Sequence, residues 1–403
     1  MKKILIIETE HEGHYLTGYI KYILRSFKNQ KINITLLTSI DAKKKAKGAL
    51  KILKNEKVKF NIDTIPNLRV NNHSSFQLIT NQIKLYFTIK KKFKEINSFV
   101  KFDHVLLTSI QKFDKALVFF GSPFQDVYFS GIYLGAKFHL SKYAIFYSSR
   151  FNYLSKIFFK KLLKIPSLNN IITNDHLLKK YLQSENWNNS HKLEFLHDPK
   201  EFNFSFNKPY SRKKLNIPNK STLILVYGAL IESKGIIELL SIFKDSKLNK
   251  DISVVLAGKQ FGKVKIFLSN NSFINKLKLE NKLFIFNSWI SEKKEALLYS
   301  AADIVWIGYK NYSYPSGVLY QAIQKSIPPL ISNDGIVNNL NKNIKVGYPV
   351  NIYDPTNIIK GINYLLKKKN NKMLKKNIFK FLKICTPKKW VSGFKLLHPK
   401  LFS

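Results

Sequence analysis

The chain has 403 residues, of which 45% are hydrophobic and 14% aromatic, enough for the cores of two or three globular domains. Its single cysteine, Cys385, excludes an internal disulfide and a zinc knuckle and suits a reducing compartment. The formal net charge is +43, but only four of the 68 basic residues are arginine, which disfavours a sequence-specific nucleic-acid reader.

The lysine excess has two explanations that the sequence leaves open. It can reflect an AT-rich genome, or it can attract the chain to anionic lipid headgroups, at roughly 1 kcal/mol for each well-placed lysine. Only four apolar residues, at 4–7, follow the first lysines, which is too short for the core of a signal peptide. We therefore expect a cytoplasmic protein, peripheral at the inner membrane if the lysines act on lipid.

The N-terminal half alternates short apolar runs with amphipathic stretches, a pattern typical of strands separated by helices. The predicted strands are residues 4–7, 32–37, 105–107, 116–120, 144–147 and 171–173. Two helical stretches, 83–93 and 154–164, combine apolar residues with clustered lysines. Each is either an interfacial membrane helix or a core-facing helix with a basic outer face.

The periodicity lapses over the polar, proline-bearing residues 198–219, and a second series of strands follows. These predicted strands are residues 223–227, 253–257, 283–286, 304–307, 330–331 and 347–350. Two such series predict an α/β protein with two doubly wound, Rossmann-like domains, at residues 1–200 and 201–372. Residues 373–403 have apolar positions at helical spacing and a break at Pro387, and we expect this segment to return to the first domain.

A Ser-Gly pair, Ser316-Gly317, stands between the buried strand 304–307 and the start of a helix. The first amides of a helix have no internal partner and carry the positive end of its dipole, and glycine lets a phosphate approach the backbone. The pair therefore predicts an anion site, although a serine here can also be a plain helix cap.

A second strand-to-helix turn places Lys234 next to a helix that begins near Gly235. Both turns lie at carboxyl ends of strands, so they open on the same crevice of a doubly wound sheet. Lys234 and the amides after Ser316 are thus predicted to hold the two phosphates of one diphosphate, the alternative for Lys234 being a solvated surface lysine.

With these residues in view, the second half resembles the family 4 (group 1) glycosyltransferases of the GT-B fold, over roughly residues 190–370. The family's Gly-Arg-Leu and Lys-Gly motif is matched by Gly228-Ala229-Leu230 and Lys234-Gly235, with Ala229 in place of the arginine. Two glutamates eight residues apart are typical of the family, and Ser313 and Gln321 occupy their positions here. In the family the second glutamate accepts hydrogen bonds from the donor ribose, and the resemblance implies the same role for the amide oxygen of Gln321, without the charge. The Ser-Gly-Val-Leu segment resembles a subset in which backbone amides and serine replace the loop of the first glutamate.

The resemblance implies retaining, metal-independent transfer of a sugar from a nucleotide-diphosphate sugar, with no further cofactor and with a UDP-sugar favoured over a GDP-sugar. Expected partners are this donor, a glycan or lipid-linked acceptor, and an anionic membrane surface, in the synthesis of a bacterial surface polysaccharide. The chain contains no Asp-x-Asp motif. The resemblance assigns donor binding to a set of residues in both domains: Gly13, Gly228, Lys234, Gly235, Ser316, Gly317, Val318 and Gln321.

Two histidines of the first domain are candidates for contact with the acceptor. His14 follows the first strand, where the family has a glycine-rich loop, and His139 ends a turn-rich segment. Either histidine can instead be structural. In the second domain Trp289 follows the end of a strand, where members of the family often bind the nucleobase, but we expect Trp289 to pack in the core.

Two other functions remain open from the sequence. Ala229, Ser313 and Gln321 also suit a catalytically inactive GT-B module that binds nucleotide or glycan as a partner subunit. A basic polyanion-binding protein is a third reading, disfavoured by the four arginines and by the two specific turns.

Overall fold

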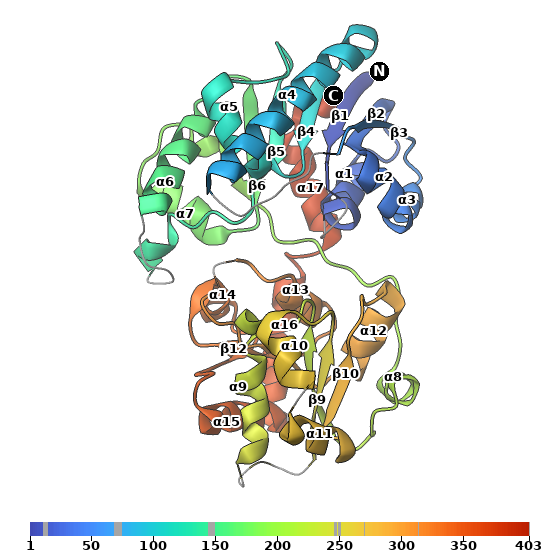
Figure 1. Cartoon of the computed structure of the whole chain (residues 1–403), viewed down its shortest axis with the longest axis vertical. Coiled ribbons are helices and arrows are strands. Elements are labelled where there is room, and N and C mark those ends of the chain that lie inside the picture. Colours follow the sequence, from blue (N-terminus) through green and yellow to red (C-terminus); the bar gives the residue numbers. More distant parts are fainter. Residues whose placement is uncertain are drawn as a thin grey trace. The chain divides into compact units, whose positions relative to one another are not determined.

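The computed structural model describes residues 1–10, 15–67, 75–143, 150–245, 248, 251–269, 271–312 and 314–402. The chain divides into two compact units, which Figure 1 shows. Unit 1 comprises Met1–Pro199 and Pro387–Ser403, and unit 2 comprises Lys200–Thr386.

Unit 1 is built on a parallel sheet which, over the described residues, has seven strands in the order β3-β2-β1-β4-β5-β6-β7. The strands are β1 (Lys2–Ile7), β2 (Ile32–Ser39), β3 (Asn61–Ile65), β4 (His104–Leu107), β5 (Phe129–Ile132), β6 (Leu168–Thr173) and β7 (Leu193–Phe195). The strand order reverses beside β1, and ligands of doubly wound sheets bind at the carboxyl ends of strands at such a point.

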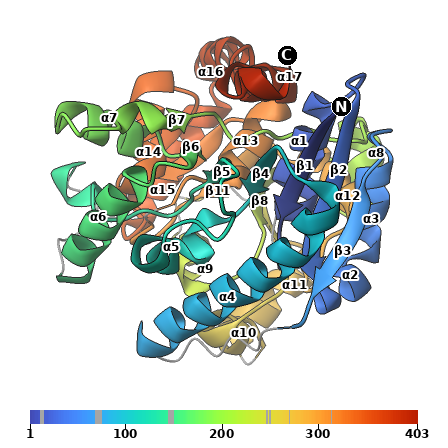
Figure 2. The same ribbon diagram turned by 90° about the horizontal axis from the view of Figure 1, so that it is seen from above.

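Helices cover both faces of this sheet, because successive side chains of a strand point to opposite faces. Leu5 and Ile7 of β1 join one core and Ile4 and Ile6 join the other. The first core is closed by α4 (Ser75–Val100), α5 (Asp114–Phe120), α6 (Arg150–Leu163) and α7 (His176–Ser184). The second is closed by α1 (Lys21–Ser26), α3 (Lys47–Lys54) and α17 (Pro387–Leu397), as Figure 2 shows from above.

The remaining helical segments of unit 1 are short. They are α2 (Ile40–Lys45), the π-helical η1 (Tyr15–Ile20), and the 3-10 turns η2 (Ile110–Lys112), η3 (Leu140–Tyr143), η4 (Ser190–Lys192) and η7 (Pro399–Leu401).

Unit 2 repeats the design, with a parallel sheet that has six strands over its described residues, in the order β10-β9-β8-β11-β12-β13. The strands are β8 (Thr222–Tyr227), β9 (Ile252–Ala257), β10 (Leu283–Phe286), β11 (Ile304–Ile307), β12 (Pro329–Ser332) and β13 (Tyr348–Val350). Its helical segments are α8 (Lys208–Leu215), η5 (Glu232–Lys234), α9 (Ile236–Leu240), η6 (Ser241–Lys244), α10 (Gly262–Ser269), α11 (Ser272–Leu279), α12 (Glu292–Ala301), α13 (Gly317–Gln324), α14 (Gly335–Ile344), α15 (Pro355–Leu366) and α16 (Lys368–Leu382).

The strands predicted from apolar runs are largely confirmed. All six predicted in the second half are present, as are those at 4–7, 32–37, 105–107 and 171–173. The strand predicted at 116–120 is wrong: these residues lie in α5, where Ala116 and Leu117 are buried while Phe119 and Phe120 are exposed, a helical pattern of burial. The strand predicted at 144–147 lies outside the described residues.

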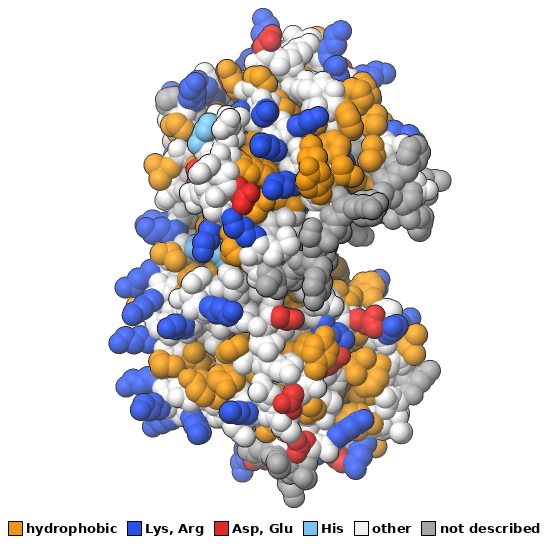
Figure 3. All heavy atoms as spheres, turned by 90° about the vertical axis from the view of Figure 1, so that its left-hand side faces the viewer, with side chains coloured by type: hydrophobic (Ala, Val, Ile, Leu, Met, Phe, Trp, Pro, Cys, Tyr) orange, Lys and Arg blue, Asp and Glu red, His pale blue; other side chains and the backbone are white. Residues whose placement is uncertain are grey.

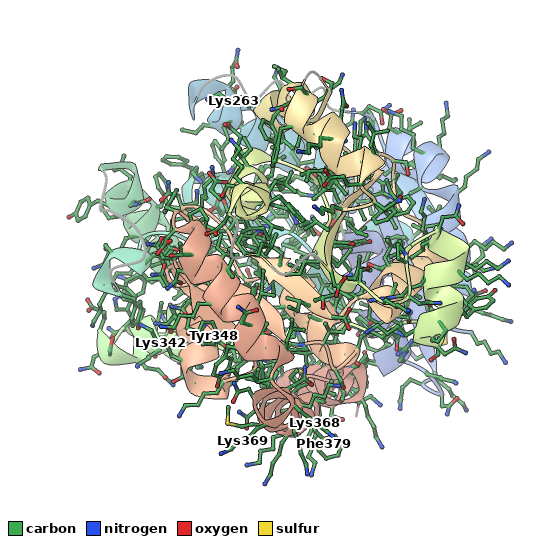
Figure 4. All side chains as sticks on the ribbon, turned by 90° about the horizontal axis from the view of Figure 1, so that it is seen from below. Lys263, Lys342, Tyr348, Lys368, Lys369 and Phe379 are labelled. Atoms are coloured by element: carbon green, nitrogen blue, oxygen red, sulfur yellow. The ribbon has the colours of Figure 1, made fainter. Side chains whose placement is uncertain are left out.

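The C-terminal segment is divided between the units. α16 packs on α13, α14 and α15 of unit 2 through Leu374, Ile378 and Phe381. Figure 4 shows Lys368 and Lys369 of this helix pointing away from the unit. The return to unit 1 therefore begins at Pro387, not at 373, because the apolar face of α16 is already covered by unit 2.

α17 is held in unit 1 by aromatic packing. Trp390 is 2% exposed, with its ring 6.0 Å from that of Tyr19 and 6.1 Å from that of Tyr22. Phe394 stacks on Trp390 at 5.4 Å. Within the described residues, no helix has both the length and the apolar character needed to cross a bilayer.

We expect Trp390→Ala to lower the free energy of unfolding of unit 1 by about 3–5 kcal/mol, because it leaves a large cavity in a closed core. Chemical denaturation followed by circular dichroism measures the change. Phe379→Ala on α16 is the matched control, since that ring is 61% exposed and its loss should change the free energy by less than about 0.5 kcal/mol. Equal effects of the two changes would contradict the packing described for α17.

Candidate active site

The turn after β8 depends on two glycines with left-handed backbone. Gly228 has φ of +94° and Gly235 has φ of +62°, values that favour glycine. A Cβ on Gly235 would stand 2.2 Å from the carbonyl oxygen of Gly308, the residue that follows β11. Only glycine therefore lets the turn before α9 lie against the loop after β11.

Lys234 is fixed by this close approach. Its carbonyl accepts a hydrogen bond from Nε1 of Trp306 at 2.8 Å, and its Nζ donates to the carbonyl oxygen of Tyr227. Burial lowers the pKa of Lys234 to about 8. The contacts of this ammonium group among the described residues are the Tyr227 carbonyl and the ring of Tyr309, and no carboxylate of these residues forms an ion pair with it.

The turn after β11 leads into α13 and presents its first amides. Ser316 is the N-cap, and its Oγ accepts a hydrogen bond from the amide of Leu319 at 3.4 Å. The amides of Gly317 and Val318 lie in the first turn, where a helix offers no carbonyl to bind them and where the dipole is positive. The site thus has two kinds of anion-binding group, a lysine and a helix N-terminus.

Tyr309 connects the two turns. Its ring lies under Nζ of Lys234, with 5.2 Å from the nitrogen to the ring centre, and its hydroxyl is 3.2 Å from Oγ of Ser316. Burial raises the pKa of Tyr309, so the phenol stays neutral and the cation lies over an uncharged ring. The structure therefore brings together Lys234 and Ser316, which are far apart in the sequence, as predicted.

Gln321 faces inward rather than toward an open surface. Its Oε1 accepts a hydrogen bond from the Tyr299 hydroxyl at 2.9 Å, and its Nε2 donates to Oε1 of Glu295 on α12. The Tyr227 hydroxyl is hydrogen-bonded to the same glutamate. Burial raises the pKa of Glu295, which is half-buried beside the site.

A family model described as glycosyl transferases group 1 matches residues 207–381, the greater part of unit 2. The matched region contains both turns, Lys234, and α13. The similarity to group 1 glycosyltransferases thus falls within unit 2. A comparison with curated proteins gives no significant match.

Solved structures resemble the chain over nearly its whole length. HepE from Anabaena, in complex with UDP and glucose, has 13% identity and a TM-score of 0.69, covering 99% of this chain and 100% of that one. Sucrose-phosphate synthase from Thermosynechococcus elongatus has 14% identity and a TM-score of 0.68, covering 100% and 99%. A glycosyltransferase from Rickettsia africae has 15% identity and a TM-score of 0.64, covering 99% and 98%.

These findings confirm the GT-B fold and the glycosyltransferase class predicted from the sequence. The roles of the individual residues stay predictions. Gly13 and His14 lie outside the described residues, as does Ser313. In unit 2 Trp289 is 81% exposed, so the expectation that it packs in the core is wrong. It follows the end of β10, where the chain has already left the sheet.

His139 is a core residue of unit 1. Its Nε2 is 2.9 Å from Oδ2 of Asp175, and the two side chains are 0% and 1% exposed. Oδ1 of Asp175 in turn caps α7 by accepting from the amides of Leu177 and Leu178. A fully buried imidazole has no surface that an acceptor could contact. His139 therefore has the surroundings of a structural residue.

Unit 1 has a cavity of about 370 Å³ at the carboxyl ends of β1, β2 and β3. Glu10 and Lys112 line it together with Asn67 and Gln82, and Leu85 of α4 adds an apolar wall. Behind it, the buried Glu8 accepts hydrogen bonds from Thr108 Oγ1 at 2.6 Å and Lys112 Nζ at 2.7 Å. Burial lowers the pKa of Lys112, but the charges of Glu8 and Glu10 raise it by more, so the ammonium group stays protonated between the two carboxylates.

Sequence reasoning missed Tyr309, Glu295, Glu8 and Lys112. Glu8 directly follows β1, and Tyr309 comes two residues after β11, so position after a buried strand was a usable signal for both. Glu295 gave no such signal, because the run Ser291-Glu292-Lys293-Lys294-Glu295 has the composition of a solvated helix start.

We expect His139→Ala to lower the free energy of unfolding by about 2–4 kcal/mol, because it leaves Asp175 buried without its partner and opens a cavity. Activity per folded molecule should be unchanged. Denaturation and turnover measured on the same preparation test both statements, with the exposed His191→Ala as control. Full stability with lost turnover would instead establish a catalytic role for His139.

Proposed function

We propose that the chain is a retaining, metal-independent glycosyltransferase that uses a nucleotide-diphosphate sugar as donor, a UDP-sugar in preference to a GDP-sugar. The observation that supports this proposal is a chain of contacts at one edge of the unit 2 sheet. Lys234 lies over the ring of Tyr309, and the Tyr309 hydroxyl contacts Ser316 at the N-terminus of α13. HepE, of the same fold, binds UDP and glucose in its solved structure, which supports a uridine nucleotide.

The chemistry required of this site is stabilisation of a leaving group. As the bond to the sugar breaks, negative charge builds on the departing diphosphate. The Lys234 ammonium and the amides of Gly317 and Val318 are already in place, so they offset that charge without reorganising. In this proposal the cationic groups of the protein do the work that a divalent metal does in other transferases.

We place the acceptor in the cavity of unit 1. Carboxylate and amide groups such as Glu10 and Gln82 hydrogen-bond sugar hydroxyls, and the wall formed by Leu85 suits an apolar aglycone. This combination fits a glycan or lipid-linked acceptor, as in the synthesis of a bacterial surface polysaccharide. The protein would then act in the cytoplasm, at the inner face of the membrane.

A surface of unit 1 has the composition expected for contact with anionic lipid. Phe87 of α4 and Phe119 and Phe120 of α5 are exposed by 47%, 60% and 46%, and Phe87 lies 5.2 Å from Phe120 between ring centres. The helices that form or contact this aromatic surface also carry exposed lysines: Lys84, Lys91 and Lys94 on α4, and Lys160 and Lys161 on α6. Figure 3 shows apolar side chains and lysines side by side on unit 1. We propose that this surface docks on the membrane.

An inactive module that only binds nucleotide is the second candidate. It is favoured by Ala229, which is exposed where the family has arginine, and by the inward orientation of Gln321. Transfer or hydrolysis of a bound nucleotide sugar distinguishes the two functions, because the inactive module would bind the donor and leave it intact.

We expect Lys234→Met to weaken UDP binding by about 10- to 100-fold, the scale of a lost charge-assisted hydrogen bond. Isothermal titration calorimetry measures the dissociation constant. Lys263→Met is the matched control, since it removes the same charge from unit 2 at a side chain that is 80% exposed (Figure 4). Equal affinities for the Lys234 variant and the control would place the phosphates elsewhere.

Donor binding should also depend on pH. Because Lys234 loses its proton above about pH 8, the dissociation constant for UDP should rise through that pH, by up to about tenfold per unit.

The stability of the protein should depend on pH in the opposite direction, increasing where UDP binding weakens. The unfolded chain keeps this proton to higher pH, so the cost of burying the charge disappears above about pH 8 and the free energy of unfolding rises. Both dependences should be absent from Lys234→Met.

Membrane docking is tested by sedimentation with vesicles that contain phosphatidylglycerol. We expect binding at low salt, its loss at high salt, and a further loss in the double variant Phe119→Ser/Phe120→Ser. Leu279→Ser is the control, because that side chain is 85% exposed on unit 2. Equal binding to neutral vesicles, or no effect of the double variant, would contradict the proposed surface.

A further inference from the structure

Gln321 stands where the family has a glutamate that accepts hydrogen bonds from the donor ribose, but its amide is already engaged by the protein. The oxygen accepts from Tyr299 and the nitrogen donates to Glu295, and the side chain is 7% exposed. A single amide oxygen that faces a buried tyrosine is poorly placed to receive a ligand hydroxyl. The carboxylate that the site requires must therefore come from another residue, if the site binds ribose in this way.

Glu295 is the carboxylate beside Gln321. It lies in the first turn of α12, after the carboxyl end of β10, and is half-buried, so part of it remains open to a ligand. Gln321 and Tyr227 donate hydrogen bonds to it and fix its orientation. A carboxylate has about four acceptor positions, which leaves others for ligand hydroxyls.

Tyr227 relates this carboxylate to the phosphate site. Its carbonyl oxygen accepts from Lys234, and its phenolic hydroxyl is hydrogen-bonded to Glu295. One residue therefore separates the cation from the carboxylate. A nucleoside diphosphate has the same order of chemical groups, an anionic diphosphate next to a ribose with two neighbouring hydroxyls.

We infer that Glu295 binds the ribose hydroxyls of the nucleotide, so that a carboxylate on α12 replaces the one that Gln321 lacks on α13. This inference rests on the proposed donor site. Gln321 becomes a positioning residue, which holds Glu295 through its amide nitrogen while Tyr299 holds Gln321. The exchange of glutamate for glutamine at 321 then preserves nucleotide binding instead of abolishing it.

The test compares UDP with 2′-deoxy-UDP and 3′-deoxy-UDP by calorimetry, in the wild type and in Glu295→Gln. The wild type should prefer UDP over at least one deoxy analogue by about tenfold or more, since removing the hydroxyl leaves a charged acceptor without its partner. In Glu295→Gln that preference should fall to about threefold or less. GDP and its deoxy analogues are titrated in parallel, in case guanine is the base bound.

Two further variants control for indirect effects. Glu292→Gln makes the same charge change on the same helix at an exposed position and should keep the preference for UDP. Gln321→Ala removes the amide that holds Glu295 and should lower the preference for UDP, as expected of a positioning residue. Thermal unfolding of each variant shows whether the fold is retained.

The outcomes separate this inference from the proposed function. If the wild type binds neither UDP nor GDP, the donor site itself is wrong. If it binds UDP and Glu295→Gln keeps the preference for the hydroxyl, the inference is overturned. It is also overturned if that variant loses affinity for UDP and the deoxy analogues equally, which indicates a structural residue.

Discussion

The close approach of Gly235 to the carbonyl oxygen of Gly308 is the constraint on which the proposed donor site depends. It sets the turn after β8 directly against the loop after β11, and the hydrogen bond from Trp306 to the carbonyl of Lys234 holds the two together. Lys234 then has little freedom, and its ammonium lies over Tyr309. Burial lowers the pKa of this cation, and in the proposed function the cost of burying the charge is recovered when the diphosphate binds.

The same edge of the sheet carries both the charged and the hydroxyl-binding parts of the site because β8, β10 and β11 are parallel. Their carboxyl ends meet at one edge, so Tyr227, the start of α12 and the start of α13 come together although they are separated in the chain. Gln321 on α13 and Glu295 on α12 are therefore in contact, and this contact is the basis for the inference that Glu295 supplies the carboxylate that position 321 lacks.

Unit 1 contributes a different chemistry. Its cavity combines the fixed charges of Glu10 and Lys112 with an apolar wall from α4, while the outer face of α4 and α5 carries exposed aromatic rings among lysines. α4 therefore takes part in both surfaces. In the proposed function one helix relates the acceptor cavity to the membrane, which suits an acceptor with a lipid anchor.

The sequence by itself determined the two series of strands and the two strand-to-helix turns, because buried parallel strands and glycine turns leave local patterns in the chain. The glycosyltransferase class came from the resemblance of the motifs at 228–235 and 313–321 to a known family. It could not decide whether residues 116–120 form a strand or a helix, since a short apolar run suits both until its neighbours are known. Nor could it show that His139 is enclosed with Asp175, that α16 is covered by unit 2, or that Gln321 turns toward Glu295. Those facts depend on contacts between residues distant in the chain, and only tertiary packing determines which polar side chain is buried and which remains open to a ligand.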